Sequence, residues 1–125
     1  MKKYVSWEEV EQFIDKLEEQ VKPIEGIQGV YGLPRGGLVL AVMVSHRLDI
    51  PLLMSPSHNC IIVDDICDSG ESLIHYVNNT SGENRGSNYI ATLYYKSNEL
   101  NIVPDFYIWE KGDDWIVFPW EEKYD

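Results

Sequence analysis

The sequence over residues 60–73 reads Cys60-Ile61-Ile62-Val63-Asp64-Asp65-Ile66-Cys67-Asp68-Ser69-Gly70-Glu71-Ser72-Leu73. Its first part is an apolar run of β-branched residues, which predicts a strand buried on both faces of a parallel sheet. In open α/β sheets, ligands bind outside the carboxyl ends of the strands. The polar residues that follow the apolar run are therefore expected to form a site.

The side chains after this strand suit a phosphorylated sugar. Ser69, Gly70 and Ser72 suit a phosphate, because a loop that leads into a helix offers free backbone N–H groups. Asp64 and Asp65 suit sugar hydroxyls or a hydrated cation. An Asp-rich turn with a helix cap would have a similar composition. The functional interpretation is favoured because acids, a glycine and hydroxyls gather within so short a segment.

Length and charge limit the class of protein. A chain of 125 residues fits one domain, which we expect to span residues 1–125. The formal net charge of −11 argues against sequence-independent binding to nucleic acid or to anionic membranes, although Mg²⁺ and backbone amides can still bind a small phosphorylated ligand. With only two cysteines, no signal-like N-terminus and no apolar run that could span a bilayer, we expect a cytoplasmic protein without nucleic-acid or membrane partners.

Strand and helix patterns alternate along the chain. A capping box at Ser6-Trp7-Glu8-Glu9 predicts an amphipathic helix that ends before Pro23. We expect the other helices at residues 38–48 and 72–78, a surface loop at 79–88, and further strands at 29–33, 50–54, 89–95 and 106–109. This alternation predicts an α/β fold with a mainly parallel central sheet flanked by helices.

The segment Asp64 to Ser72 resembles the signature of the type I phosphoribosyltransferases, in which a hydrophobic strand leads to two acids and then to an acid-hydroxyl-glycine loop. The resemblance implies the fold of that family and a site for 5-phosphoribosyl 1-diphosphate. Asp64 and Asp65 would bind the ribose hydroxyls. The 5′-phosphate would be bound by the loop Asp68, Ser69, Gly70, Glu71 and Ser72.

Two positions of this loop carry more specific expectations. In the purine members of the family, the acid that matches Asp68 lies near the base nitrogen that becomes glycosylated and is the proposed general base. Glu71 departs from the family pattern, in which a lysine or a small residue is commoner. A carboxylate beside a phosphate is unfavourable unless its side chain turns away.

The sequence Pro34-Arg35-Gly36-Gly37 follows the expected strand at residues 29–33. Glycines before a helix are commonly plain turn residues. The family resemblance gives them another role, in a loop for the diphosphate group. Gly36 and Gly37 would let backbone N–H groups approach phosphate oxygens, and Arg35 would add positive charge. In this family the peptide bond before the equivalent basic residue can be cis.

Lys96, Trp115 and Ile116 resemble the base-binding residues of the bacterial xanthine-guanine phosphoribosyltransferases. There the lysine contacts the 6-oxo group, the aromatic ring stacks on the purine, and the next residue contacts the ring edge through its backbone. Taken singly, Lys96 would be a solvated strand-end lysine and Trp115 a core residue. Glu121 matches a tail acid that can help Asp64 and Asp65 hold Mg²⁺, although a surface glutamate would look the same.

The resemblance as a whole implies a purine salvage enzyme with a reduced hood over the base. It would transfer phosphoribosyl from 5-phosphoribosyl 1-diphosphate to guanine, xanthine or hypoxanthine with Mg²⁺ as cofactor, as a homo-oligomer (dimer or tetramer). A long flexible loop that precedes the motif strand in the family is reduced here to residues 55–59. A rival interpretation is a non-catalytic protein that senses phosphoribosyl diphosphate or a purine nucleotide. Asp68, Lys96 and Trp115 favour the enzyme, whereas the short loop and Glu71 favour the sensor.

Overall fold

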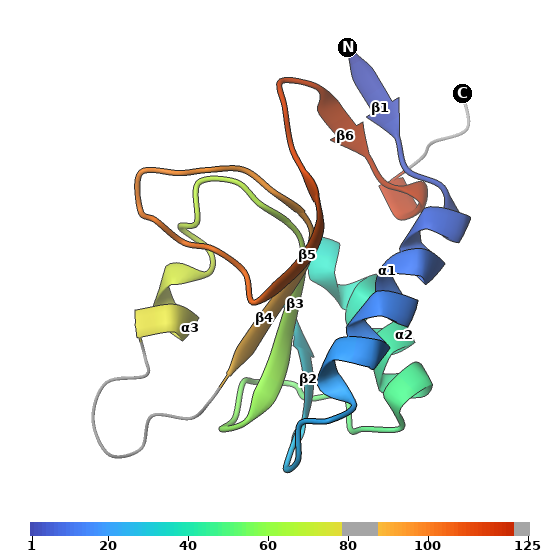
Figure 1. Cartoon of the computed structure of the whole chain (residues 1–125), viewed down its shortest axis with the longest axis vertical. Coiled ribbons are helices and arrows are strands. Elements are labelled where there is room, and N and C mark those ends of the chain that lie inside the picture. Colours follow the sequence, from blue (N-terminus) through green and yellow to red (C-terminus); the bar gives the residue numbers. More distant parts are fainter. Residues whose placement is uncertain (79–87, 122–125) are drawn as a thin grey trace.

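The computed structural model describes residues 1–78 and 88–121 and has an α/β architecture (Figure 1). The helices are α1 (Trp7–Val21), α2 (Gly36–Leu48), α3 (Ile74–Asn78) and the 3₁₀ helix η1 (Pro119–Glu121). The strands are β1 (Lys2–Tyr4), β2 (Gly29–Gly32), β3 (Cys60–Cys67), β4 (Tyr89–Tyr95), β5 (Phe106–Glu110) and β6 (Trp115–Val117).

Four of the strands form a parallel sheet in the order β2-β3-β4-β5. Val63 of β3 pairs with Gly32 of β2 and with Ala91 of β4, which fixes the register at the centre of the sheet. Helices α1 and α2 cover one face, and α3 lies on the other (Figure 1). The mainly parallel sheet flanked by helices that the sequence predicts is thus confirmed.

The side chains of β3 alternate between two apolar cores. Ile61 and Val63 belong to the core beneath α1 and α2, whereas Cys60 and Ile62 belong to the core on the opposite face. All four are fully buried. The apolar run is therefore a strand covered on both sides, as its uninterrupted β-branched sequence predicts.

The two long helices begin for different physical reasons. In α1, the Ser6 hydroxyl accepts a hydrogen bond from the Glu9 backbone N–H and the Glu9 carboxylate accepts one from the Ser6 N–H, each at 3.1 Å, so the predicted capping box is present. Helix α2 has no side-chain cap at Arg35. Instead, its start packs directly on β3. Gly37 allows this close approach because it has no Cβ, which would overlap the Val63 carbonyl oxygen.

The structure corrects three of the predicted element boundaries. Residues 50–54 are not a strand but make one bridge to the sheet edge, between Leu52 and Val30. Pro51 has no N–H to donate, which limits pairing there.

Strand β3 continues to Cys67, so Asp64 and Asp65 lie in the strand and not in a loop. The helix expected from residue 72 begins at Ile74, after turns. Most of the predicted loop at 79–88, residues 79–87, lies outside the described residues.

Strands β1 and β6 form a second, two-stranded parallel sheet, which we call the hood. Lys2 pairs with Trp115 and Tyr4 pairs with Val117, so segments from opposite ends of the chain lie side by side (Figure 1). Ile116 is 6 % exposed and joins the core beneath α1 and α2, which attaches the hood to the main domain. The sequence patterns predict neither of these two short strands.

Candidate active site

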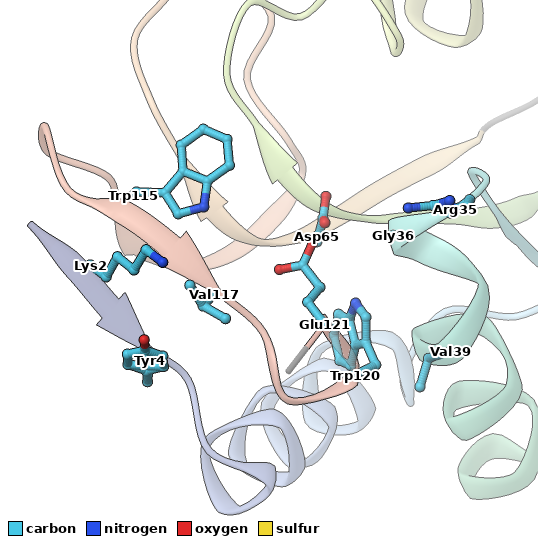
Figure 2. A pocket seen from close by; sticks show the side chains of 10 residues that line it. All are labelled: Lys2, Tyr4, Arg35, Gly36, Val39, Asp65, Trp115, Val117, Trp120 and Glu121. Atoms are coloured by element: carbon cyan, nitrogen blue, oxygen red, sulfur yellow. The ribbon is translucent and has the colours of Figure 1, made fainter. Parts of the chain in front are cut away.

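A cleft of about 1140 Å³ lies between the main sheet and the hood (Figure 2). Its walls come from four parts of the chain: β1, the start of α2, the carboxyl end of β3, and the segment from β6 to η1. The lining residues are Lys2, Tyr4, Arg35, Gly36, Val39, Asp65, Trp115, Val117, Trp120 and Glu121. The cleft therefore lies where α/β folds bind ligands, outside the carboxyl end of a central strand.

The cleft brings together five of the residues that the sequence singled out: Arg35, Gly36, Asp65, Trp115 and Glu121. Two of these residues, Gly36 and Asp65, come from different motifs and lie against each other. A Cβ at Gly36 would overlap the Asp65 carboxylate, so the absence of a side chain at residue 36 lets this carboxylate lie against the first turn of α2. The peptide bond between Pro34 and Arg35, next to this contact, is cis.

The two adjacent glycines of this loop have different surroundings. Gly36 faces the cleft, whereas Gly37 is buried against β3 and its N–H donates a hydrogen bond to the Leu33 carbonyl oxygen at 2.7 Å. In this structure Gly37 thus serves close packing of α2 on the sheet. Its predicted contact with a diphosphate oxygen stays a prediction.

Asp64 and Asp65 form a pair of half-buried carboxylates at the end of β3. Asp64 Oδ1 accepts a hydrogen bond from the Asp65 N–H at 2.9 Å, and Asp65 Oδ1 accepts one from the Ile66 N–H at 2.8 Å. Burial, together with the neighbouring Asp65 carboxylate, raises the pKa of Asp64 to about 8. Two crowded carboxylates of this kind favour a cation or a hydroxyl donor as a third partner.

The predicted phosphate loop is a set of turns between β3 and α3. Gly70 has a φ of +83°, a left-handed conformation that favours glycine, and it is buried against Ile102. The Gly70 carbonyl oxygen accepts the N–H groups of Leu73 and Ile74, which closes the turn. The side chains of Ser69, Glu71 and Ser72 are exposed around it.

A side chain that the sequence did not indicate holds the turn in place. The Asn98 amide donates to the Ile102 carbonyl oxygen at 2.9 Å and accepts the Ile102 N–H at 2.9 Å. Ile102 in turn covers Gly70. Asn98 carries no motif that distinguishes it from an ordinary loop residue, so only the fold reveals its role.

The predicted base-binding residues have three different environments. Trp115 is 70 % exposed and lines the cleft, so its interpretation as a core residue is wrong. Lys96 is half-buried just beyond β4 and does not line the cleft. The Ile116 side chain points into the core, which leaves its backbone as the part that could meet a ligand.

Glu121 and Trp120 complete the wall below the hood. The Glu121 carboxylate accepts a hydrogen bond from the Phe118 N–H at 2.9 Å and lines the cleft (Figure 2). Trp120 stacks on Phe118 with 5.1 Å between ring centroids. The sequence analysis assigned no site role to five further residues of this cleft: Lys2, Tyr4, Val39, Val117 and Trp120.

Known proteins resemble this chain along nearly all of its length. The xanthine-guanine phosphoribosyltransferase of Idiomarina loihiensis is 26 % identical, over 94 % of this chain and 86 % of that protein. The enzyme of the same name from Cereibacter sphaeroides is 30 % identical, with the same two coverages. The crystal structure of a purine phosphoribosyltransferase from Pyrococcus horikoshii Ot3 superposes with a TM-score of 0.80 and 30 % identity, over 99 % of this chain and 96 % of that one.

This chain belongs to the xanthine-guanine phosphoribosyltransferase family. No family model matches it. The resemblance inferred from the motifs and the type I phosphoribosyltransferase fold are both confirmed. The alignments with the two bacterial enzymes run over 143 and 149 residues, more than this chain contains, so those enzymes carry residues without a counterpart here. Among the described residues, no helix has the length and apolar character needed to cross a membrane.

Proposed function

We propose that this protein transfers the 5-phosphoribosyl group from 5-phosphoribosyl 1-diphosphate to a 6-oxopurine: guanine, xanthine or hypoxanthine. The bond between the anomeric carbon and the diphosphate oxygen breaks, and a bond from that carbon to a purine nitrogen forms. The observation that carries this proposal is the contact between Gly36 and Asp65 in a cleft shared with Trp115. It supports the proposal because the residues expected to bind the diphosphate, the ribose and the base, Gly36, Asp65 and Trp115, line one cleft.

Each part of the substrate then has a chemically suitable partner. Arg35 and the backbone around Gly36 would bind the diphosphate, and Asp64 and Asp65 would accept hydrogen bonds from the ribose hydroxyls. The exposed ring of Trp115 offers a face on which any purine can stack. Lys96, an ammonium donor, would favour an oxo group over an amino group at the purine 6-position.

Asp68 is the residue that we assign to proton transfer. It follows the last residue of β3, and its side chain is 57 % exposed, although it is not among the residues that line the cleft. As the purine nitrogen attacks the anomeric carbon, the proton on the base would pass to this carboxylate. Gly70 and the hydroxyls of Ser69 and Ser72, close by in the same turn, would bind the 5′-phosphate.

Magnesium fits the donors that the cleft contains. Asp65 and Glu121 both line it, and carboxylate oxygens are the ligands that Mg²⁺ prefers. The described residues include no group of three or more side chains that could hold a metal by themselves, so water and diphosphate oxygens would complete the shell, as is usual for Mg²⁺. When bound, Mg²⁺ would neutralise charge on the leaving diphosphate. To test this, the protein is titrated with phosphoribosyl diphosphate in a calorimeter, once in the presence of Mg²⁺ and once in the presence of EDTA. Equal affinity of the protein for the ligand under both conditions would contradict the role of Mg²⁺.

One assay distinguishes the enzyme from the rival sensor. The protein is mixed with phosphoribosyl diphosphate, Mg²⁺ and each of the three bases, and nucleotide and diphosphate are quantified. We expect turnover with at least one base. Saturable binding without turnover for all three would refute the transferase and support a binding protein. The physical reason for such an outcome would be the loss of the long covering loop of the family, which is reduced here to residues 55–59.

A pair of variants tests the proton acceptor within the same assay. Asp68→Asn is expected to lower kcat by about 10²-fold or more, the range typical for loss of a general base, with phosphoribosyl diphosphate binding largely retained. Asp49→Asn is the matched control, because Asp49 is exposed at the end of α2 and asparagine tolerates its left-handed backbone. The homo-oligomer that the family resemblance implies stays a prediction, which light scattering would check.

A further inference from the structure

Lys111 is a nearly buried lysine that no sequence motif indicates. It is the first residue after β5, and its side chain is only 12 % exposed. Its ammonium lies 3.7 Å from Asp68 Oδ2 and donates to the Gly112 carbonyl oxygen at 3.4 Å. Lysine is almost never fully buried unless it is paired, so Asp68 is the partner that makes this position acceptable.

The sheet register places this lysine in the same row as Asp68, two strands away. Cys67 pairs with Tyr95, and Tyr95 pairs with Glu110. The next residue on each of the three strands is Asp68, Lys96 or Lys111, so these three lie in a row across the carboxyl edge of the sheet.

Backbone hydrogen bonds continue the sheet pairing into this row. The Lys96 N–H donates to the Cys67 carbonyl oxygen, and the Lys111 N–H donates to the Tyr95 carbonyl oxygen, both at 2.8 Å. The backbone of Lys111 is thus anchored to the sheet and does not belong to a free loop. The Lys111 ammonium can hold a neighbouring carboxylate at a defined place.

We propose that Lys111 positions the Asp68 carboxylate for proton transfer, an inference that rests on the proposed function. Asp68 is more than half exposed, and without a partner its carboxylate would sample several rotamers. The ion pair engages Oδ2 and leaves Oδ1 for the N–H of the purine. Lys111 acts through Asp68 and is a positioning residue, because the carboxylate and not the ammonium meets the base.

The test compares substitutions that separate charge from shape. Lys111→Met keeps the length of the stem and removes the charge, whereas Lys111→Arg keeps the charge. We expect Lys111→Met to lower kcat about 10-fold to 10²-fold, the cost of a misplaced reacting group, with the KM for phosphoribosyl diphosphate changed less than about twofold. Lys111→Arg should restore most of kcat. Lys22→Met is the control, since Lys22 is exposed beyond the last residue of α1.

A double-mutant cycle with Asp68→Asn shows whether the lysine acts through the aspartate. In the Asp68→Asn background, Lys111→Met should cause no further loss of kcat, because the group that it positions is gone. Independent, multiplying losses would overturn the proposal and indicate a general structural role. If the methionine variant does not fold, Lys111→Gln replaces it in the cycle, because an amide keeps a donor for the Gly112 carbonyl oxygen without a charge.

The remaining outcomes distinguish a failure of the Lys111 proposal from a failure of the proposed transferase function. If the wild-type protein is active and the Lys111→Met variant keeps full activity, the positioning role is overturned and the transferase assignment stands. A wild-type protein that turns over none of the three bases overturns both. A reduced kcat in Lys111→Met that the arginine variant does not restore also counts against the role, because it would show that shape and not charge matters.

Discussion

Asp64 is expected to make the ligand-free protein less stable as the pH rises. Its pKa is 3.8 as a free side chain and about 8 in the folded protein, where burial and the Asp65 carboxylate oppose its charge. Between these values the folded state holds a proton that the unfolded state has lost, so the free energy of unfolding falls with increasing pH. One proton gives a slope of at most about 1.4 kcal/mol per pH unit. From pH 5 to pH 7, Asp64 therefore removes up to about 2.7 kcal/mol.

The variant Asp64→Asn isolates this contribution. Asparagine does not titrate, and its side-chain oxygen can still accept the Asp65 N–H that Asp64 Oδ1 accepts at 2.9 Å. Urea unfolding at pH 5, 6, 7 and 8 without divalent cations, followed by tryptophan fluorescence, measures the free energy of unfolding of both proteins. The difference should move in favour of the variant by about 2–3 kcal/mol between pH 5 and pH 7. Asp49→Asn serves as the control, and parallel curves for wild type and Asp64→Asn would refute the reasoning.

The bound ligand should oppose this effect of pH on stability. A cation or a ribose hydroxyl beside Asp64 would favour the ionised carboxylate, so binding of Mg²⁺ with phosphoribosyl diphosphate there would release the proton. The affinity for this ligand pair is expected to rise from pH 6 to about pH 8, and saturation with it should flatten the dependence of stability on pH. Affinity that is independent of pH in the wild type would show that Asp64 does not face the ligand.

Three further substitutions test the turn, the hood and the first helix. Gly70→Ala should cost about 1–3 kcal/mol in urea unfolding, because a Cβ there meets a left-handed φ and would lie 2.7 Å from Ile102 Cγ1. Gly26→Ala, with φ +82° and open space around it, measures the backbone part alone, and an equal loss in both would exclude the packing part. Trp115→Ala should raise the KM for the purine about 10-fold without loss of stability, because stacking on this exposed ring contributes about 1–3 kcal/mol; an unchanged KM would remove it from the base site. Ser6→Ala should lower the free energy of unfolding by about 1 kcal/mol and leave kcat unchanged. If the variant is as stable as the wild type, the capping box does not contribute to stability.

The central sheet could be predicted because its signal is local. An uninterrupted β-branched run such as residues 61–63 has few alternatives to a strand buried on both faces, and the periodic apolar residues of α1 begin at a capping box. The hood could not be predicted in this way. Strands β1 and β6 have three residues each and pair across the whole length of the chain, and no local pattern reports such a partner.

The candidate site shows the same division between local and long-range information. The sequence motifs contain Gly36 and Asp65, but their contact depends on how closely α2 packs on β3, which Gly37 allows. Lys111 stands outside every motif, and only the register of β3, β4 and β5 places it beside Asp68. Sequence therefore indicates which residue types a site needs, whereas the fold determines which of them meet.

The charge of the protein and of the cleft provides a reason, independent of the motifs, to expect that Mg²⁺ is needed for ligand binding. The protein has a net charge of −11, and the cleft is lined by two cationic side chains, Lys2 and Arg35, and two carboxylates, Asp65 and Glu121. The lining is therefore formally balanced and cannot by itself attract a diphosphate that carries several negative charges. Asp65 and Glu121 would hold a divalent cation, and its charge would offset the repulsion between these carboxylates and the ligand. For this reason we expect Mg²⁺ to be required for the binding of phosphoribosyl diphosphate itself, before any chemical step.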